Sequence, residues 1–319
     1  MFASKTLLLT GGTGFFGQSF LSYCIKNKIK FKKIIIFSRD EFKQYEMQKY
    51  YNPEKYKFLR YFLGDVRDLS RLKIAFRDVD FVLHAAALKH VPAAEYNPTE
   101  YIKTNIIGSQ NVIEAAMFNR VKKVIALSTD KAASPLNLYG ATKLCLEKLF
   151  TSSNSYVGNL NISFSCIRYG NVLGSRGSVL PLFLEQEKKS FFTITDIKMT
   201  RFNIMIEECI KIVLFALKKS IGGEIFIPKV PSIKIIDLAK AINDNKNIKY
   251  IGIRPGEKLH EELITPAESH NTYYFGKYYV ITTNAKLTTK LKKVKMKLGY
   301  NSRDNNFLTI PQIRKLIEK

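Results

Sequence analysis

The stretch LLLTGGTGFFGQSF, residues 7–20, decides the fold of this chain. A short apolar run leads directly into Gly11, Gly14 and Gly17, and a helix is predicted to follow them. Glycines at this spacing allow a tight turn, a close approach of backbone to a pyrophosphate, and packing of the helix on the strand. The free N–H groups of the predicted helix would face the phosphates. Because a strand precedes the glycines and a helix follows them, the stretch predicts a dinucleotide-binding turn and not a plain glycine-rich loop.

Short β-rich runs alternate with longer amphipathic segments along the first half of the chain. Several of these runs are continuously apolar, as expected for strands that are buried on both faces of a parallel sheet. The alternation predicts an α/β fold with a doubly wound parallel Rossmann sheet. The predicted strands are residues 5–10, 32–38, 57–64, 80–87, 122–129 and 161–169, and the clearest predicted helices are residues 95–119 and 137–156.

The character of the chain changes after Tyr169, where the loops become longer. A helix is predicted over residues 207–219, and residues 223–229 have the pattern of another strand. We expect residues 1–170 to form a dinucleotide-binding domain. Residues 171–319 are expected to form mainly a smaller C-terminal substrate-binding lobe, with residues 220–230 returning to the sheet.

The charge of the chain is unusual: its 319 residues carry a formal net charge of +24, although 46% of them are hydrophobic. A basic surface can serve a nucleic acid, an anionic membrane or an anionic small substrate. Lysine is spread from end to end and forms no long block, which favours solvated faces over a dedicated surface. We therefore predict no nucleic-acid partner.

The cysteines and histidines are far apart and show no metal-site spacing, so we predict neither a metal site nor a disulfide framework. The N-terminus leaves no room for a secretory signal before the first predicted strand. No apolar run approaches the roughly 20 residues that a membrane span needs. We expect a soluble protein of the reducing cytoplasm, without a membrane anchor.

The second predicted strand ends in IIIFSRDEFK, residues 34–43. A carboxylate at the end of this strand would bind both ribose hydroxyls of NAD and repel a 2′-phosphate. Ser38 and Arg39 stand there instead, and Lys43 follows one turn later, so the sequence favours NADP. Asp40 follows at once and could take the ribose role, which leaves NAD as the less favoured alternative.

Two further motifs are expected at the same cofactor. GDVRD places Asp65 and Val66 where an adenine would lie, and the small residues of HAAA, residues 84–87, let the cofactor lie close. The expected cofactor-binding residues are Gly11, Thr13, Gly14, Phe15, Phe16, Gly17, Ser38, Arg39, Lys43, Asp65, Val66, Ala85, Ala86 and Ala87, together with Tyr139 and Lys143.

The stretch LSTDKAASPLNLYGATK, residues 127–143, concentrates proton donors and acceptors. Tyr139 and Lys143 are four residues apart on a predicted helix, so they share a face. An ammonium beside a phenol stabilises the phenolate and lowers its pKa toward neutrality. Such a tyrosine can take the proton from a sugar hydroxyl while hydride leaves the same carbon, and Thr129 can hydrogen-bond that hydroxyl.

Asp130 and Lys131 exceed what simple alcohol oxidation needs. They end the fifth predicted strand, at the carboxyl edge where open α/β sheets bind ligands. One carboxyl and one amine near a substrate suggest an elimination, in which a base takes a proton and an acid protonates a leaving hydroxyl. Lysine serves as a base only where burial and neighbouring charge lower its pKa. The alternative is a structural Asp–Lys pair on the surface.

Motifs along nearly the whole chain resemble those of the extended short-chain dehydrogenase/reductases. Within that family the chain is similar to the soluble UDP-N-acetylglucosamine 4,6-dehydratases that invert carbon 5. The run HAAALKHVP combined with STDKA is far more specific than the glycine pattern, and the residues after about His270 match least. The motifs are GGTGFFG, SRDE, GDVRD, HAAALKHVPAAEYNP, STDKAASPLNLYGATK, RYGNVLGSRGSV, ITDIKMTRF, GGEIFIPKVPS and RPGEKLHEELI.

The resemblance implies a role for each residue. Thr129, Tyr139 and Lys143 would oxidise carbon 4. Lys131 would be the base at carbon 5, and Asp130 the acid that expels the 6-hydroxyl as water. Hydride would then return to carbon 6, so NADP is regenerated. The residues implied at the UDP-sugar are Lys89, Asn171, Arg176, Ser178, Val179, Thr195, Arg201, Arg254 and Glu257, with Arg254 suited to the pyrophosphate.

The resemblance also implies a biological setting. The family opens the pseudaminic acid pathway, which serves flagellin glycosylation, and its members form homo-oligomers such as dimers and hexamers. The nearest alternatives are a retaining dehydratase or an epimerase acting on another nucleotide sugar. Long membrane-bound dehydratases similar to this chain usually carry Met where Tyr139 stands. A nucleic-acid-binding protein on a dinucleotide fold would need clustered Lys and Arg with interleaved aromatics, and the chain shows no such patch.

Overall fold

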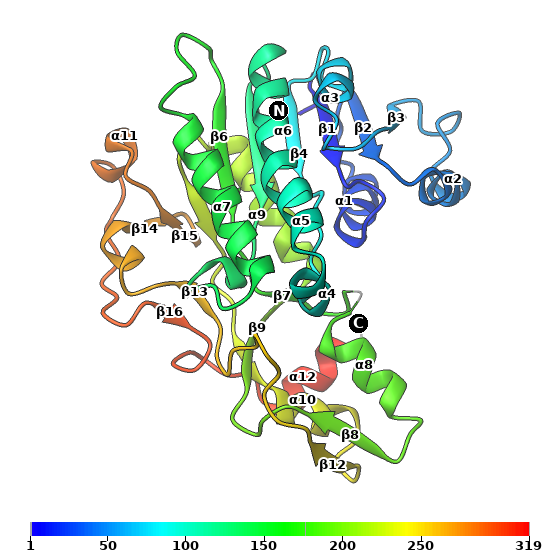
Figure 1. Ribbon diagram of the computed structural model, residues 1–319, viewed down its shortest axis with the longest axis vertical. Helices are drawn as coiled ribbons and strands as arrows, with labels where there is room; N and C mark the ends of the chain where they lie inside the picture. Colours follow the sequence, from blue (N-terminus) through cyan, green and yellow to red (C-terminus); the bar gives the residue numbers. More distant parts are fainter. Residues whose placement is uncertain (1, 176, 319) are drawn as a thin grey trace.

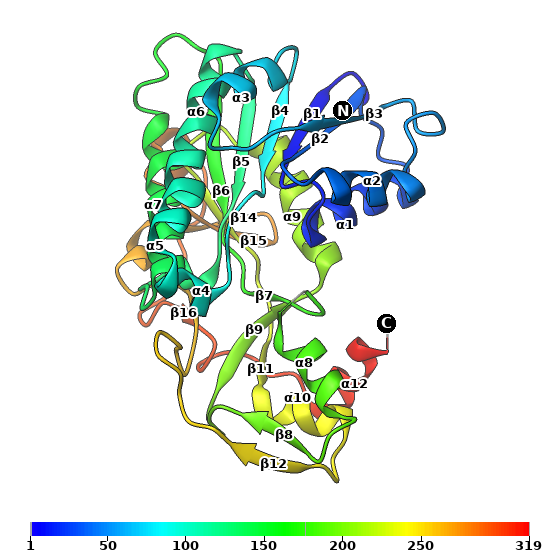
Figure 2. The same ribbon diagram turned by 45° about the vertical axis from the view of Figure 1, so that its right-hand side comes forward.

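The structure, a computed structural model, describes residues 2–175 and 177–318. Helices cover both faces of a large sheet, and a smaller lobe lies beyond one end of its strands (Figures 1 and 2). The nine strands of this sheet, in spatial order, are β14 (Thr272–Phe275), β15 (Tyr278–Ile281), β10 (Ile225–Ile227), β6 (Ser163–Ile167), β5 (Lys123–Leu127), β4 (Phe81–His84), β1 (Thr6–Thr10), β2 (Lys33–Ser38) and β3 (Leu59–Leu63).

The strands from β10 to β3 all run parallel, and β15 and β14 add an antiparallel edge beyond β10. All residues of β1 are buried, as a strand covered on both faces requires. The order places β4 and β2 on the two sides of β1, which is the point where a doubly wound sheet reverses direction. The predicted α/β fold with a doubly wound parallel sheet is confirmed.

Each face of the sheet has its own buried apolar cluster. Phe20 and Val213 belong to the cluster under α1 (Phe15–Lys26), α2 (Glu41–Tyr50) and α9 (Ile206–Lys219). Val112 and Phe150 belong to the cluster under α3 (Leu69–Ala75), α6 (Gly108–Phe118) and α7 (Leu138–Ser153). The sheet is therefore held rigidly from both sides, and its carboxyl edge is a firm base for a site.

The helix predicted over residues 95–119 is divided in the structure. It consists of α4 (Val91–Tyr96), α5 (Pro98–Tyr101), a π-helix η1 (Ile102–Ile107) and α6. Pro98 separates α4 from α5, because proline lacks a backbone N–H and disfavours helical geometry at the residue before it. Within η1, the buried Asn105 amide donates to the carbonyl of Leu88 and to the hydroxyl of Thr142. These bonds tie the chain after β4 to α7.

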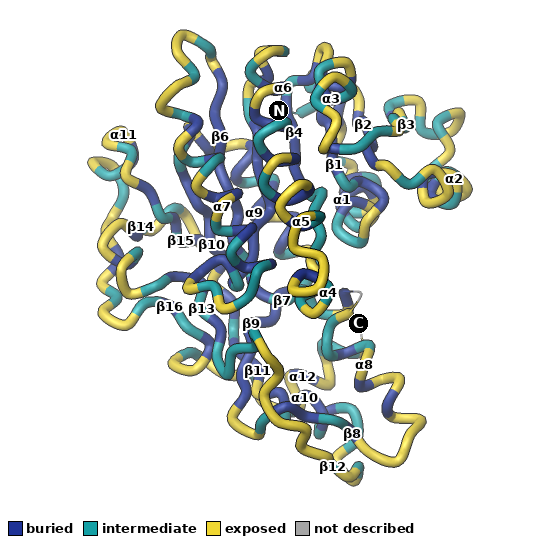
Figure 3. The backbone as a smooth tube through the Cα atoms, in the orientation of Figure 1, coloured by how far each residue is buried: buried dark blue, intermediate teal, exposed yellow. Residues whose placement is uncertain are grey.

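The smaller lobe packs around Phe183, Leu238 and Ile313. Its helices are α8 (Val179–Gln186), α10 (Ile235–Ile242) and α12 (Ile310–Ile317), and its outer strand β12 (Asn247–Tyr250) is largely exposed (Figure 3). The other short elements are β7 (Asn171–Val172), β8 (Phe191–Ile194), β9 (Thr200–Ile204), β11 (Ser232–Lys234), β13 (Glu262–Ile264), β16 (Tyr300–Asn301), η2 (Asp130–Ala132), η3 (Glu268–Asn271) and α11 (Ala285–Thr288). Among the described residues, no helix is both long and apolar enough to cross a membrane.

Residues 220–230 are predicted to return to the large sheet, and the strand there is β10, which pairs with β6. Residues 272–281, which are expected in the smaller lobe, also lie in the large sheet. The hairpin of β15 and β14 then covers β10 and is not predicted from the sequence. In β15 the buried Tyr278 and Val280 alternate with half-buried neighbours, which is typical of a strand with one face toward solvent.

A buried ion network joins the end of β6 to α7. The Arg168 guanidinium is fully buried and donates to both carboxylate oxygens of Glu147, at 2.9 and 2.6 Å. It also donates to both oxygens of Glu268, each at 2.8 Å, and to the carbonyl of Leu263 at 3.0 Å. Because each charge compensates another, the network stabilises the fold only while it is complete.

Arg168→Met is expected to lower the free energy of unfolding by about 3–5 kcal/mol, because it leaves Glu147 buried without its cation. Urea unfolding followed by circular dichroism measures the change. Lys189→Met is the control, since it breaks a surface pair with Glu185 in which the side chains are 62% and 68% exposed. The control substitution should lower the free energy of unfolding by less than about 1 kcal/mol. Similar losses in the two variants would show that the Arg168 network contributes no more than a surface pair.

Candidate active site

A cavity of about 830 Å³ lies between the carboxyl ends of the strands and the smaller lobe. Its walls come from the turn after β1, the tips of β2 and β3, the chain after β4, the end of β5, the start of α7 and loops of the lobe. Ligands of open α/β sheets bind at this edge. The volume lies in the range of roughly 300–1,000 Å³ that is usual for ligand sites.

The turn after β1 depends on its glycines. Gly11 has a φ of +65°, and a Cβ there would lie 2.8 Å from the backbone nitrogen of Ala86. Gly17 does not line the cavity: a Cβ on it would collide with the backbone oxygen of Gly12, so this glycine serves the packing of α1 on the turn. Gly14 is the N-cap of α1 and has no side chain to cap it, which leaves the first N–H groups available to a phosphate. The turn therefore fits a dinucleotide.

A chain of hydrogen bonds fixes the segment after β4. The Thr10 hydroxyl accepts from the backbone N–H groups of Ala85 and Ala86, both at 3.2 Å, so its proton points to Nδ1 of His84 at 2.8 Å. Burial lowers the pKa of His84 to about 3, so the ring is neutral and its Nε2 donates to Ser109 at 3.1 Å. The small residues on the cavity wall are thus held in one position.

Except for Gly17, all the predicted cofactor residues line the cavity.

At the tip of β2 the acidic side chains are already paired. Asp40 is the N-cap of α2: it accepts from the backbone N–H of Lys43 at 2.9 Å and lies 2.7 Å from the Lys43 ammonium. The Arg39 guanidinium is 53% exposed and lies 3.9 Å from Asp65. Ser38 is buried at the end of the strand. Arg39 and Lys43 both line the cavity, where Lys43 is paired with the Asp40 carboxylate of the cap and Arg39 lies at the longer distance from Asp65.

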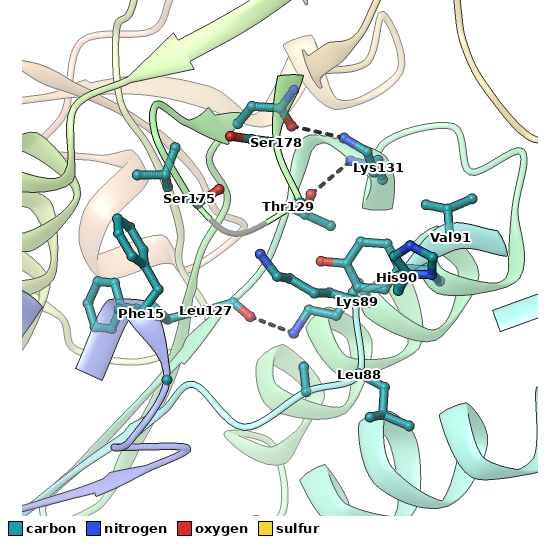
Figure 4. A pocket seen from close by; sticks show the side chains of 18 of the residues that line it. Phe15, Leu88, Lys89, His90, Val91, Leu127, Thr129, Lys131, Ser175 and Ser178 are labelled. Carbon is teal, nitrogen blue, oxygen red and sulfur yellow. Dashed lines mark hydrogen bonds between the residues drawn. The ribbon is translucent and has the colours of Figure 1, made fainter. Parts of the chain in front are cut away.

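Tyr139 and Lys143 both reach the cavity from α7. The Lys143 ammonium donates to the carbonyl of Leu127 at 2.6 Å (Figure 4), and burial lowers its pKa to about 8. Burial raises the pKa of Tyr139 to about 12, although Lys131 and a hydrogen bond with Thr129 act in the lowering direction. The predicted fall of the phenol pKa toward neutrality is therefore wrong for the protein alone, because desolvation outweighs the nearby cations.

Three ionisable groups meet at the end of β5. The Lys131 ammonium lies 3.0 Å from Asp130 and 3.3 Å from Glu261, and it donates to Asn171 at 3.3 Å (Figure 4). Burial raises the pKa of Asp130 despite the nearby ammonium. Burial alone would lower the pKa of Lys131, but the two carboxylates raise it above its usual value. The lowered pKa that a lysine base requires is therefore not found in the protein alone.

Asp130 lies behind the cavity wall and does not line it. Its side chain is 0% exposed, and Oδ1 accepts from the Thr129 hydroxyl at 2.9 Å. Oδ2 is buried without a hydrogen-bond partner among the described residues. The backbone is the cause, because the Asp130 N–H donates to the carbonyl of Tyr169 and begins the 3₁₀ turn η2. Thr129 and Lys131 both line the cavity, so a proton on Asp130 can reach it through either neighbour.

The residues implied at the sugar nucleotide lie on the lobe side of the cavity and beside β4. Figure 4 shows Lys89 extending into the space between Phe15 and Thr129. Arg254 is 55% exposed and lies 3.8 Å from Glu257. Of the residues implied at the sugar nucleotide, those that line the cavity are Lys89, Asn171, Ser178, Val179, Thr195, Arg201, Arg254 and Glu257. Arg176 falls outside the described residues.

Sequence reasoning missed Glu261 and Lys258. Both line the cavity, and the Lys258 ammonium donates to the carbonyl of Ala133 at 2.6 Å. They belong to the motif RPGEKLHEELI, from which only Arg254 and Glu257 are predicted. Glu261 and Glu262, which follow His260, are the available signal in the sequence. A carboxylate that is buried needs a cation as a partner, and that cation has to come from elsewhere in the chain.

A model of the polysaccharide biosynthesis protein family matches residues 7–283 of this chain. The chain belongs to this family. A relative from Campylobacter jejuni subsp. jejuni serotype O:23/36 (strain 81-176) is named UDP-N-acetylglucosamine 4,6-dehydratase (inverting). It is 53% identical over 320 residues, which cover 96% of this chain and 94% of the relative. The resemblance found in the motifs is thereby confirmed.

Two other comparisons bear on the site. A relative from Rickettsia bellii (strain OSU 85-389), named UDP-glucose 4-epimerase, is 41% identical over 331 residues, with 99% of this chain and 96% of the relative covered. The X-ray structure of Pen from Bacillus thuringiensis is 39% identical, with a TM-score of 0.91 over 100% of this chain and 99% of that one. The fold is therefore shared along the whole chain, and relatives with two different names have to be told apart by chemistry.

Proposed function

We propose that this protein is a UDP-N-acetylglucosamine 4,6-dehydratase that inverts carbon 5. The observation that carries the proposal is that the oxidising pair, Tyr139 and Lys143, lines the same cavity as Lys131, whose ammonium lies 3.0 Å from the buried Asp130. Oxidation of an alcohol needs only the oxidising pair, so Lys131 and Asp130 indicate an elimination. The Campylobacter relative with the same name supports the proposal.

We infer that the cofactor is NADP and not NAD. Arg39 and Lys43 place two cations at the tip of β2, and Asp40 is engaged by the backbone N–H of Lys43. Bound NADP would supply a hydride acceptor for carbon 4, a hydride donor for carbon 6 and, when oxidised, a positive charge near the phenol. Tyr139, whose pKa burial raises to about 12, needs such a charge in order to lose its proton near neutral pH.

In the first half of the reaction, Tyr139 takes the proton of the 4-hydroxyl while the hydride leaves carbon 4. Thr129 orients that hydroxyl with a hydrogen bond. Lys143, with a pKa of about 8, stays largely protonated near neutral pH and keeps a cation on the same face of α7. The product of this half is a ketone at carbon 4, which makes the proton on carbon 5 acidic.

The second half is an elimination. Lys131 as a neutral amine takes the proton of carbon 5, and Asp130 in its acid form supplies the proton with which the 6-hydroxyl leaves as water. The two groups share one proton across 3.0 Å, so its transfer from nitrogen to oxygen produces both reactive forms at once. Burial, which raises the pKa of Asp130, favours that transfer. Hydride then adds to carbon 6, and carbon 5 regains a proton from the opposite face.

Incubation with UDP-N-acetylglucosamine tests the proposal directly. We expect a product lighter by one water, in which deuterium placed at carbon 4 is found at carbon 6. In heavy water, one deuterium should enter at carbon 5, with the inverted configuration. A product of unchanged mass and inverted carbon 4 would make the protein a 4-epimerase, as the Rickettsia relative is named. Dehydration with the original configuration at carbon 5 would make it a retaining dehydratase.

Arg39→Ala is expected to narrow or reverse a preference for NADP over NAD, because it removes the guanidinium that can fork onto the 2′-phosphate. Isothermal titration with both cofactors measures the ratio of their dissociation constants. Arg60→Ala is the matched control: Arg60 lies on the neighbouring strand β3, donates to the carbonyls of Lys57 and Leu59, and does not line the cavity. Equal affinities for the two cofactors in the unmutated protein would contradict the role of Arg39.

We propose that the lobe residues bind the UDP moiety, with Arg254 at its pyrophosphate, because they line the same cavity as Lys131, Tyr139 and Lys143. Two other implications of the resemblance stay predictions: the pseudaminic acid pathway with its link to flagellin glycosylation, and a homo-oligomer. The cytoplasmic location and the lack of a nucleic-acid partner, which were inferred from composition, also stay predictions.

A further inference from the structure

Glu261 is a second carboxylate at the Lys131 amine. It is 2% exposed, and its Oε1 lies 3.3 Å from Nζ of Lys131 and 3.8 Å from Nε of Arg201. Its Oε2 is buried and has no hydrogen-bond partner within the described part of the chain. The backbone is held firmly, because its N–H donates to the Ser302 hydroxyl at 2.9 Å and its carbonyl accepts from the Ser302 N–H at 2.8 Å. An oxygen left unsatisfied in this way costs free energy of folding, which indicates a role beyond stability.

Arg201 does not need Glu261 as its partner. Its guanidinium already donates to the carbonyls of Thr200 at 2.8 Å and Leu259 at 3.2 Å, and to Glu257 at 3.4 Å. The Glu261 carboxylate lies closer to Lys131 than to Arg201. Its main electrostatic partner is therefore the amine that faces the cavity.

The pKa values of the two carboxylates at Lys131 are shifted in opposite directions. Burial raises the pKa of Asp130. Burial also acts to raise the pKa of Glu261, but Lys131, Arg201 and Lys258 outweigh it and lower that pKa. Glu261 thus stays ionised while Asp130 can take up a proton. The charged and titratable groups around this cluster are Asp130, Glu261, Arg201, Lys89, Lys258 and Tyr139.

We propose that Glu261 is a positioning residue that sets the basicity of Lys131 through a fixed negative charge 3.3 Å from the amine. The inference rests on the proposed dehydratase function, in which Lys131 takes the proton of carbon 5. A fixed anion stabilises the ammonium form of Lys131, so it makes the amine a stronger base and also lowers the fraction of the amine that is neutral at a given pH. The same anion disfavours ionisation of Asp130, which keeps the acid form in supply. Glu261 itself neither gives nor takes a proton.

Glu261→Gln tests this inference, because it keeps the shape of the side chain and removes its charge. We expect kcat for water loss near neutral pH to rise roughly tenfold with little change in KM, because more of Lys131 is then the neutral amine that takes the proton. A nearby anion raises the pKa of every proton-binding neighbour, so its removal lowers the pKa of both Lys131 and Asp130. Both limbs of the pH–kcat profile should therefore move to lower pH, by about one to three units.

Two further variants separate charge from structure. Glu261→Asp keeps the charge but draws it back from the amine, and should move the profile in the same direction by less. Glu262→Gln is the matched control, because the neighbouring Glu262 does not line the cavity. It should leave both kcat and the pH profile as in the unmutated protein. A profile that moves equally in the Glu261→Gln and Glu262→Gln variants would overturn the inference.

The ionisation of Lys131 can also be measured without turnover. Trace acetylation with acetic anhydride at alkaline pH, followed by mass spectrometry of the peptide that contains Lys131, reports the fraction of neutral amine. Glu261→Gln should raise the rate of acetylation, and Glu262→Gln should not. One outcome is that the unmutated protein fails to dehydrate its substrate but Glu261→Gln raises the rate of Lys131 acetylation. The proposed function is then wrong, and the action of Glu261 on Lys131 stands. The other outcome is that dehydration occurs but Glu261→Gln changes neither the rate of Lys131 acetylation nor the pH–kcat profile. Glu261 is then only structural, and the inference is wrong.

Discussion

Lys131→Ala is expected to release almost no dehydrated product, with kcat reduced about 10²- to 10⁴-fold, because it removes the amine that takes the proton of carbon 5 in the proposed reaction. Binding of the UDP-sugar should change little, since binding is spread over the lobe residues. The variant can still oxidise carbon 4, so a small amount of reduced cofactor should accumulate. Chromatography with mass detection of the product lighter by one water measures the first effect, and absorbance of the reduced nicotinamide measures the second.

Lys123→Ala is the matched control for Lys131. Lys123 is a half-buried lysine at the opposite end of the same strand, β5, where its ammonium donates to the carbonyl of Ser220 at 2.7 Å. Its loss can lower stability but should leave kcat unchanged. Dehydration by the Lys131→Ala variant at close to the normal rate would remove Lys131 from the role of base.

Tyr139→Phe is expected to lower kcat by about 10²- to 10⁴-fold while KM changes little, because the phenol acts in the transition state. Both water loss and reduction of the cofactor should disappear together, since oxidation precedes elimination. This pattern distinguishes Tyr139 from Lys131, whose loss leaves the oxidation step in place. Steady-state kinetics combined with the absorbance of reduced nicotinamide separates the two.

Tyr101→Phe is the control for a lost phenol hydroxyl. Tyr101 packs in the same small cluster as Tyr139, and its hydroxyl donates to the carbonyl of His90 at 2.6 Å, outside the cavity lining. Its kcat should stay close to normal. A near-normal kcat in the Tyr139→Phe variant would mean that another group takes the proton of the 4-hydroxyl.

Local features of the site could be predicted from the sequence. The turn at Gly11 follows from backbone sterics, and Tyr139 and Lys143 share a face through helical spacing alone. Asp130 and Lys131 are neighbours in the chain, so their meeting required no knowledge of the fold. The division of the helix predicted over residues 95–119 could also have been predicted, because Pro98 has no backbone N–H to donate to a helical hydrogen bond.

Features that depend on distant contacts could not be predicted in the same way. Glu261 reaches Lys131 only because β13 and β16 bring the end of the motif to β5, and no local pattern indicates that pairing. The pKa values of Tyr139 and Lys131 depend on burial and on charges from other segments, so the rise in both could not be predicted from the sequence. The position of Asp130 behind the wall follows from one backbone hydrogen bond to Tyr169.

The hairpin of β15 and β14 has a consequence for the newly made chain. Strand β10 lies between β6 and β15, so its outer edge has no partner until the residues of β15 have left the ribosome. Until then, the edge presents unpaired N–H and C=O groups to any other extended chain. Glu261 also emerges 130 residues after Lys131, so the amine has no such carboxylate beside it during that interval. Between the synthesis of β10 and that of β15, a nascent chain is therefore open to aggregation at this edge, and the hairpin is what closes it.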